Sequence, residues 1–190
     1  KIEVIQNLMK VVDELLIGGA MAYTFLQALG QPTGKSLVEA DKIDLAKHLL
    51  EEGRSKLRLP SDHVVAAELK AGADSQVVDT IPEGMMGLDI GPKTVEAFST
   101  AISNAKTVIW NGPMGVFEIK ESSKGTFDIA EAMAVNTTAK NIIGGGDSVK
   151  AVKKAKLADK MTFISTGGGA SLELLEGKDL PGVTCLAEKV

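Results

Sequence analysis

Residues 141–148 read Asn-Ile-Ile-Gly-Gly-Gly-Asp-Ser, and residues 163–170 read Phe-Ile-Ser-Thr-Gly-Gly-Gly-Ala. In both stretches a short apolar run enters three consecutive glycines, and a helix-forming segment follows. Alternation of strands and helices is typical of an α/β domain, and the carboxyl ends of parallel strands meet at one edge, where ligands bind. The two stretches therefore predict an α/β fold with its functional site at that edge.

The strand-to-glycine pattern occurs twice more along the chain. Ile17 leads into Gly18-Gly19, and Trp110 leads into a glycine-containing loop at 111–115. Glycine lets backbone N–H groups approach an anion without a Cβ in the way, and a following helix adds the positive end of its dipole. Tight turns alone would also use glycine, but two triplets at equivalent positions favour a phosphate or nucleotide site.

Composition sets the broad class of the protein. The chain has 190 residues, of which 44% are hydrophobic, and a net charge of −4. We expect one domain over residues 1–190. The negative net charge argues against nucleic-acid binding. No membrane span is expected, because the longest apolar run, 15–29, is broken by polar residues and glycines. The single cysteine, Cys185, argues for a reducing, cytoplasmic setting. A monomer is expected.

Several common motifs are missing. No Gly-x-Gly-x-x-Gly fingerprint follows any expected strand, which disfavours a dinucleotide oxidoreductase. The Gly34-Lys35-Ser36 stretch lacks the first glycine of a P-loop, since position 29 is leucine. An enzyme acting on a nucleotide and a stand-alone nucleotide- or anion-binding regulatory module both remain open from the residues alone.

The predicted architecture is a Rossmann-like three-layer sandwich, with a mostly parallel central sheet and helices on both faces. Hydrophobic periodicity and turn residues predict the elements. Helices are expected over 2–9, 20–29, 39–52, 93–104, 125–136, 148–156 and 169–175, and strands over 11–17, 56–59, 63–67, 107–110, 141–143 and 161–165, with one edge strand within 71–84 and a last strand near Val183.

Six blocks of sequence resemble phosphoglycerate kinase. They are residues 17–25, 87–92, 110–118, 143–148, 165–173 and 180–183, which stand in the order of that family and cover essentially the whole chain. The resemblance implies the carboxy-terminal, nucleotide-binding half of an enzyme that transfers phosphoryl between 1,3-bisphosphoglycerate and ADP in glycolysis. It also implies that the amino-terminal domain, which binds 3-phosphoglycerate, is absent, so that this chain binds nucleotide without turnover.

The resemblance further implies roles for individual residues. Glu118 would hold the ribose hydroxyls, Asp147 would bind Mg²⁺, and Gly167, Gly168, Gly169 and Lys1 would act at the transferred phosphoryl group. Ala20 departs from the family, which often has a third glycine there. Pro113, Val116 and Phe117 would line the nucleoside site, and Gly19, Leu37, Gly87 and Leu88 match the adenine slot of the family. The residues implied to bind ADP or ATP are Gly18, Gly19, Leu37, Gly87, Leu88, Asn111, Pro113, Val116, Phe117, Glu118, Gly145, Gly146, Asp147 and Ser148.

Two observations leave the roles of charged residues open. Asp147 follows three glycines at the start of an expected helix, so it could cap that helix as well as bind metal. The only arginines, Arg54 and Arg58, lie in a helix-to-strand connection. Arginine is the usual clamp for a doubly charged anion, so the anchor for a phosphoglycerate substrate is expected outside this chain.

Overall fold

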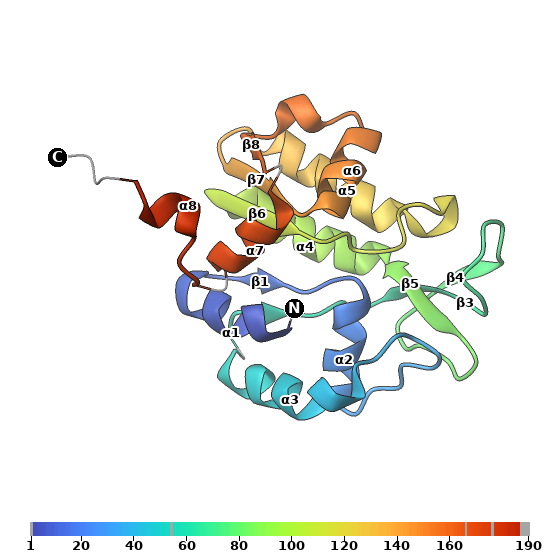
Figure 1. Cartoon of the computed structure of the whole chain (residues 1–190). Helices are drawn as coiled ribbons and strands as arrows, with labels where there is room; N and C mark the ends of the chain where they lie inside the picture. The colour runs from blue at the N-terminus through green and yellow to red at the C-terminus, as the bar shows by residue number, and fades with distance from the viewer. Residues whose placement is uncertain (1, 54, 166, 176, 187–190) are drawn as a thin grey trace.

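The structure is a computed structural model that describes residues 2–53, 55–165, 167–175 and 177–186 (Figure 1). In chain order its elements are α1 (Ile2–Val11), β1 (Leu15–Leu16), α2 (Ala20–Ala28), η1 (Ala40–Lys42), α3 (Ile43–Glu52), β2 (Leu57–Arg58), β3 (His63–Ala66), β4 (Ser75–Val78), β5 (Met86–Ile90), α4 (Pro92–Asn104), β6 (Thr107–Asn111), η2 (Lys120–Ser122), α5 (Lys124–Val135), β7 (Lys140–Gly144), α6 (Gly146–Lys154), η3 (Ala158–Lys160), β8 (Phe163–Ile164), α7 (Gly168–Leu175) and α8 (Pro181–Thr184).

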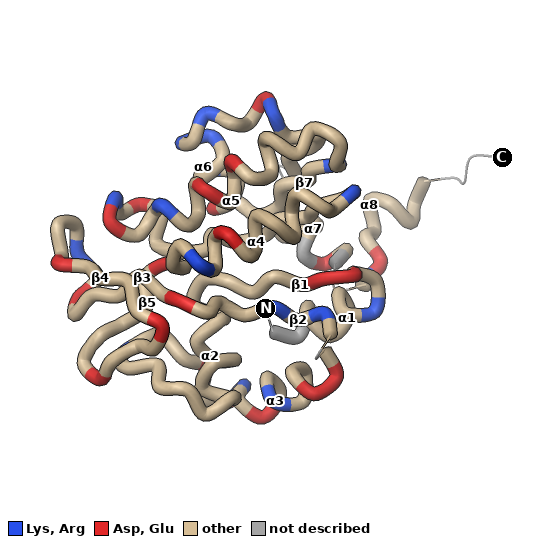
Figure 2. Tube along the Cα trace, turned by 180° about the vertical axis from the view of Figure 1, so that it is seen from behind, with Lys and Arg blue, Asp and Glu red and all other residues tan. Residues whose placement is uncertain are grey.

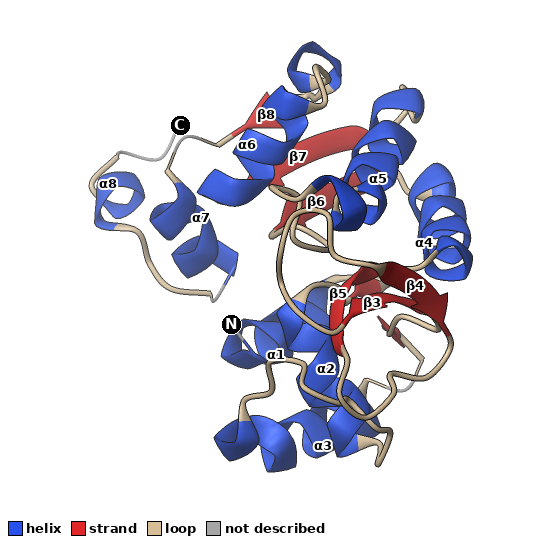
Figure 3. Ribbon diagram, turned by 90° about the vertical axis from the view of Figure 1, so that its right-hand side faces the viewer, coloured by secondary structure: helices blue, strands red, loops and turns tan. Residues whose placement is uncertain are grey.

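The described strands form three sheets (Figure 3). β1 pairs with β2 in parallel, and β6, β7 and β8 form a second parallel sheet in that order. β4, β3 and β5 form an antiparallel sheet with β3 in the middle. The chain is therefore an α/β domain with parallel and antiparallel sheets, and within its described part three separate sheets stand where one mostly parallel sheet was expected.

The antiparallel pairing of β3 with β4 follows from a short connection. Residues 67–74 join these two strands, and a parallel crossover needs about a dozen residues or more. Residues 79–85 then lead from β4 to the other side of β3, where β5 also pairs antiparallel with β3. Gly72 and Gly84 supply positive φ angles of 76° and 84° in the two connections. The edge strand expected within 71–84 is β4.

The buried side chains form three clusters that follow the order of the chain. The largest packs α4, α5 and α6 onto β6 and β7, with Trp110, Ile129, Met133 and Ile143 at its centre. A second joins α1, α2 and α3 beside β1 and β2. The third links α2 to β3 through Tyr23, Leu26, Val65 and Ile81.

Two expected elements differ from the structure. The apolar run at 11–17 does not form one long strand, because α1 continues to Val11 and β1 is confined to Leu15–Leu16. The strand expected near Val183 is wrong, since residues 181–184 form the short helix α8. Pro181 stands in its first turn, a position where proline favours helix initiation.

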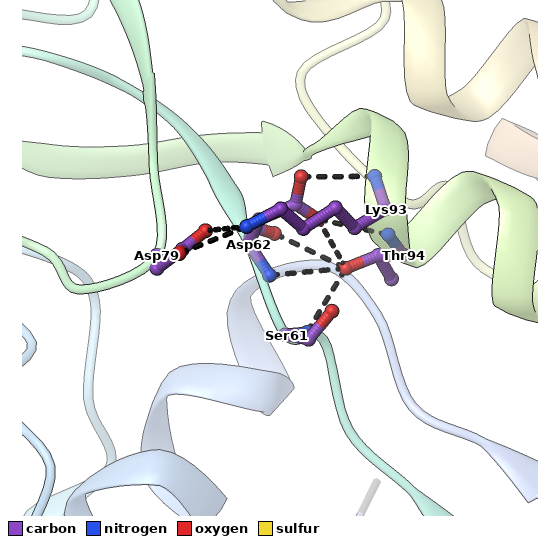
Figure 4. Close-up of polar contacts among 5 residues, drawn as sticks. All are labelled: Ser61, Asp62, Asp79, Lys93 and Thr94. Carbon is purple, nitrogen blue, oxygen red and sulfur yellow. Dashed lines mark hydrogen bonds and ion pairs between the residues drawn. The ribbon is translucent and has the colours of Figure 1, made fainter.

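A buried carboxylate anchors the start of α4 (Figure 4). Asp62 accepts hydrogen bonds from the backbone N–H groups of Lys93 and Thr94 at 2.9 and 2.8 Å, and from the Thr94 hydroxyl at 2.6 Å. Burial by itself would raise the pKa of Asp62, but these bonds hold the pKa below its ordinary value. Lys93 reaches over to Asp79 at 2.7 Å. Asp62, which directly precedes β3, thus fixes β5 and α4 to the rest of the domain.

Figure 2 marks the positions of charged residues on the Cα trace, where basic and acidic residues alternate along the helices and loops. In the described residues, no helix is long and apolar enough to cross a membrane.

Candidate nucleotide-binding edge

The turns that follow β1 and β6 contact each other. The Gly19 N–H donates a hydrogen bond to the Met114 carbonyl at 3.0 Å. A Cβ on Gly18 would meet the Met114 side chain, so the two turns are in close contact. Gly19 has φ 65° and is the N-cap of α2. The first two glycine turns therefore lie together at one end of their strands.

The turns that follow β6, β7 and β8 meet in the same manner. The Gly112 N–H donates to Ser148 Oγ at 2.6 Å, which ties the β6 loop to α6. A Cβ on Gly145 would lie 3.1 Å from Asn111 Oδ1, and one on Gly168 would lie 3.3 Å from the Gly145 Cα. All four glycine turns predicted from the sequence are thus joined by contacts between neighbours.

Helices begin at these turns with their amide groups unoccupied by side-chain caps. Gly145 is the N-cap of α6 with φ 85°, and neither it nor Gly19 makes a side-chain cap hydrogen bond. α7 starts at Gly168. The first N–H groups of a helix lack partners inside the helix, and the dipole makes that end positive. Such ends are suited to an anion.

Two glycines at this edge have no packing reason to be glycine. Within the described part of the chain, no heavy atom lies within 4 Å of where a Cβ would stand on Gly146 or Gly169. Both lie in the first turn of a helix, neither has a positive φ, and both are exposed. An alanine would fit at either position in this structure.

Asp147 is not the cap of α6. The N-cap is Gly145, and Asp147 sits in the first turn with an exposed side chain that pairs with Lys150 at 3.0 Å. The hydrogen bond to Asp147 also raises the pKa of Lys150. An exposed carboxylate beside free helix amides fits Mg²⁺, which takes one or two carboxylates and completes its coordination with phosphates and water. The described residues hold no cluster of three or more His, Cys, Asp or Glu side chains suited to a metal.

Ser148 has a structural task beside its predicted role. Its side chain is fully buried, and its oxygen accepts the bond from Gly112 described above. It joins the β6 loop to the β7 turn, so its loss would move both.

Hydrogen bonds to α5 and β5 hold the loop at 112–118 in place. Thr126, fully buried in α5, accepts hydrogen bonds from the N–H groups of Met114 and Gly115 at 3.1 Å each. The Val116 N–H donates to the Leu88 carbonyl at 2.9 Å. These contacts position the loop that carries the predicted nucleoside residues.

The predicted nucleoside residues differ in exposure. Phe117 is buried in the largest core cluster, while Glu118 next to it is exposed. Lys154 donates to the Phe117 carbonyl at 3.0 Å and lies 5.9 Å from the centre of its ring. Pro113 and Val116 are half-buried. The loop therefore presents Glu118 to solvent and uses Phe117 as an anchor.

The residues predicted to form an adenine slot lie around β5. The Gly87 N–H donates to Ser36 Oγ at 2.9 Å, which brings the exposed Leu37 beside this strand. A Cβ on Gly87 would collide with the Tyr23 ring of α2, so packing explains this glycine. Leu88 is buried.

Sequence reasoning missed Thr126 and Asp89. Asp89 is buried and accepts bonds from the N–H groups of Gly125 at 2.7 Å and Ile90 at 2.9 Å. Burial raises its pKa to about 7 in spite of these bonds. Asp89 could have been recognised in the sequence as a single aspartate among apolar residues, a pattern that indicates a buried polar group with hydrogen-bond partners. Lys1 lies outside the described residues, as does Thr166 before Gly167.

The chain matches known proteins over nearly its full length. The sequence profile described as phosphoglycerate kinase matches residues 1–178. The phosphoglycerate kinase of Solibacter usitatus is 64% identical over 186 residues, which are 98% of this chain and 47% of that protein. The phosphoglycerate kinase of Lactobacillus delbrueckii subsp. lactis is 56% identical over 190 residues, which are all of this chain and 47% of that protein.

Solved structures agree with the sequence matches. Phosphoglycerate kinase from Coxiella burnetii superposes with a TM-score of 0.92 at 43% identity, over 97% of this chain and 49% of that one. Phosphoglycerate kinase from Pyrococcus horikoshii superposes with a TM-score of 0.83 at 30% identity, over 96% of this chain and 47% of that one. The chain spans about half the length of the relatives that it matches. It belongs to the phosphoglycerate kinase family, the phosphotransferases of glycolysis.

Proposed function

We propose that this chain is the carboxy-terminal, nucleotide-binding half of a phosphoglycerate kinase. It would form one Rossmann-like domain over residues 1–190 and bind ADP or ATP together with Mg²⁺ in the cytoplasm, as a monomer. The whole enzyme would transfer phosphoryl between 1,3-bisphosphoglycerate and ADP. The absent half would bind 3-phosphoglycerate, and without it this chain would not turn over.

The observation that carries the proposal is the pair Gly146 and Gly169. Their positions tolerate a Cβ sterically, yet both are glycine at the start of a helix. A glycine that packing and φ do not require is explained when a ligand must approach the backbone closely. Two such positions, on neighbouring turns, support a phosphate-binding edge.

The chemistry asks little covalent work of the protein. Phosphoryl transfer depends on alignment of the reacting groups and neutralisation of charge on the phosphoryl oxygens. The N–H groups at Gly167–Gly169 and at the start of α6 would neutralise that charge from rigid positions. Asp147 would hold Mg²⁺, which would supply positive charge to neutralise the nucleotide phosphates. Glu118 would accept hydrogen bonds from the ribose hydroxyls, and the slot around Leu37 and Leu88 would take the adenine.

The proposal is tested with Gly146→Ala and Gly169→Ala, and Gly182→Ala serves as the matched control. Gly182 also lies at the start of a helix, with open space in the described structure, but away from the glycine edge. All three variants should fold, with stability unchanged or higher by up to ~1 kcal/mol. Titration of ADP against Trp110 fluorescence should show binding weakened by roughly 1–3 kcal/mol in the first two variants and unchanged in the control. Equal ADP affinity in all three variants would place the nucleotide elsewhere.

A further inference from the structure

Lys154, the last residue of α6, joins that helix to the end of the loop at 112–118. Its Nζ donates a hydrogen bond to the Phe117 carbonyl at 3.0 Å. The same Nζ lies 5.9 Å from the centre of the Phe117 ring and 5.8 Å from the centre of the Phe127 ring in α5. A cation placed over an aromatic ring is attracted by the negative face of that ring. One amine therefore holds Phe117 by two kinds of interaction.

This contact lies next to the residue proposed to hold the ribose. Glu118 follows Phe117 directly, and it is exposed. The Phe117 carbonyl belongs to the same peptide group as the Glu118 N–H, and a peptide group is planar. A bond that fixes the carbonyl therefore fixes this plane, and with it the direction in which the Glu118 side chain leaves the loop.

Helix α6 holds the loop at two points. In its first turn, Ser148 Oγ accepts the hydrogen bond from the Gly112 N–H at 2.6 Å. In its last turn, Lys154 donates to the Phe117 carbonyl. The two anchoring residues stand about 9 Å apart along the helix axis, because each residue of an α-helix adds about 1.5 Å. A single helix thus sets the course of the loop from Gly112 to Phe117.

The other lysines of α6 do not share this arrangement. Lys150 pairs with Asp147 at 3.0 Å in the first half of the helix. Lys153 is as exposed as Lys154 in the last turn, and within the described part of the chain its side chain makes no hydrogen bond or ion pair. Both lysines of the last turn favour the negative end of the helix dipole. The dipole therefore does not explain why Lys154 reaches the loop.

We propose that Lys154 is a positioning residue, which holds Glu118 where its carboxylate meets the ribose hydroxyls of a nucleotide bound at the start of α6. The ribose and the phosphates of one nucleotide are covalently joined, so the groups that bind them must keep a matching separation. Lys154 keeps this separation, because it ties the ribose end of the loop to the helix that carries Asp147 in its first turn. The inference rests on the proposed function.

The test compares the affinity of the whole chain for ADP and for 2′,3′-dideoxy-ADP, which lacks both ribose hydroxyls. Trp110 fluorescence reports binding. The native chain should bind the dideoxy nucleotide roughly tenfold or more weakly, because hydrogen bonds to a charged carboxylate are lost. Lys154→Met keeps the apolar stem and removes the donor and the charge, so this ratio should fall by roughly threefold or more. Lys154→Arg keeps a cation with N–H donors and should retain the native ratio.

Lys153→Met is the matched control, since it removes the same charge from the adjacent position of α6 and should leave the ratio unchanged. The inference alone is overturned if Lys154→Met keeps the native ratio, if Lys154→Arg loses it, or if Lys153→Met lowers it equally. A native chain that binds no ADP would overturn the proposed function instead. A native chain that binds both nucleotides equally would overturn the ribose role of Glu118, and in these two cases the role of Lys154 falls with the proposal on which it rests.

Discussion

Asp89 is a buried acid whose proton is linked to folding. Burial raises its pKa to about 7, while the N–H groups of Gly125 and Ile90 act in the opposite direction. The folded protein therefore holds this proton in a range where the unfolded chain has lost it. The resulting stabilisation is complete below the ordinary pKa of aspartate and is lost as the pH rises through about 7.

Asp89→Asn should remove this pH dependence. Asp128 and Lys124 also act on the carboxyl, and Tyr23 faces it, but the variant leaves all three in place. His63 must be separated from the effect, because burial lowers its pKa and so makes its contribution grow with pH in a similar range. Urea unfolding at about pH 5 and about pH 8 should show that the native chain loses more stability with rising pH than the variant does. Parallel curves for the two proteins would contradict this assignment.

Asp147 offers a second prediction at the level of one residue. Asp147→Ala should abolish the dependence of ATP affinity on Mg²⁺, since the metal would lose its protein carboxylate. Thermal stability should hardly change, because Asp147 is exposed and does not cap α6. Asp159→Ala removes an equally exposed charge in η3 and is the control. ATP titrations with and without Mg²⁺ test whether Asp147 is the protein ligand of the metal. An Asp147→Ala variant whose ATP affinity still depends on Mg²⁺ would exclude Asp147 as that ligand.

Among the elements, α5 determines the shape of the loop at 112–118. Thr126→Val would leave the N–H groups of Met114 and Gly115 without their acceptor, at a cost of about 1–3 kcal/mol. Thr126→Ser keeps the oxygen and should stay near the native stability. We expect weaker ADP binding in the valine variant alone, measured by Trp110 fluorescence on folded protein. If the serine and valine variants bind ADP equally, the loop does not depend on this contact.

The elements also show what could be predicted from the sequence. The strand-to-glycine turns were recognisable because their signal is local: an apolar run, glycines and a helix in succession. The hydrogen bonds between Thr126 and the loop at 112–118 could not be recognised in the sequence. They join two separate segments through a threonine, a residue that occurs in many buried helices. The prediction of one long strand at 11–17 was wrong, because an apolar run does not show where α1 ends and β1 begins.

For the molecule as a whole, the central expectation is binding without turnover. The chain alone should bind nucleotide, yet show essentially no kinase activity with saturating nucleotide and 3-phosphoglycerate. The reason is that positioning of the acceptor supplies much of the acceleration, and in the proposed division of the enzyme the anchor for a phosphoglycerate would lie in the other half. A coupled assay before and after addition of the separately produced remaining half measures this. Turnover before the addition would refute the proposal, whereas binding with no turnover after it would favour a stand-alone regulatory module.

The overall architecture was predictable only in part. Composition and the alternation of strand-like and helix-like segments predicted the α/β class, because this class depends on sums over many residues. The division into three sheets depends on which strands pair with each other, and in the described structure β1 and β6 do not pair. The antiparallel pairing of β3 with β4 depends on the short connection at 67–74, which is visible in the sequence, although the expected architecture was a mostly parallel sheet.

The three buried clusters have a consequence for how the chain reaches its fold. The second draws its buried residues from Ile5 to Leu49, the third from Tyr23 to Ile81, and the first from Ile90 to Met161. Each cluster therefore draws on one continuous part of the chain, and no cluster needs residues from both chain ends. During synthesis the amino-terminal clusters are complete before β6 is made, so folding can proceed in the direction of translation, with the glycine edge assembled last.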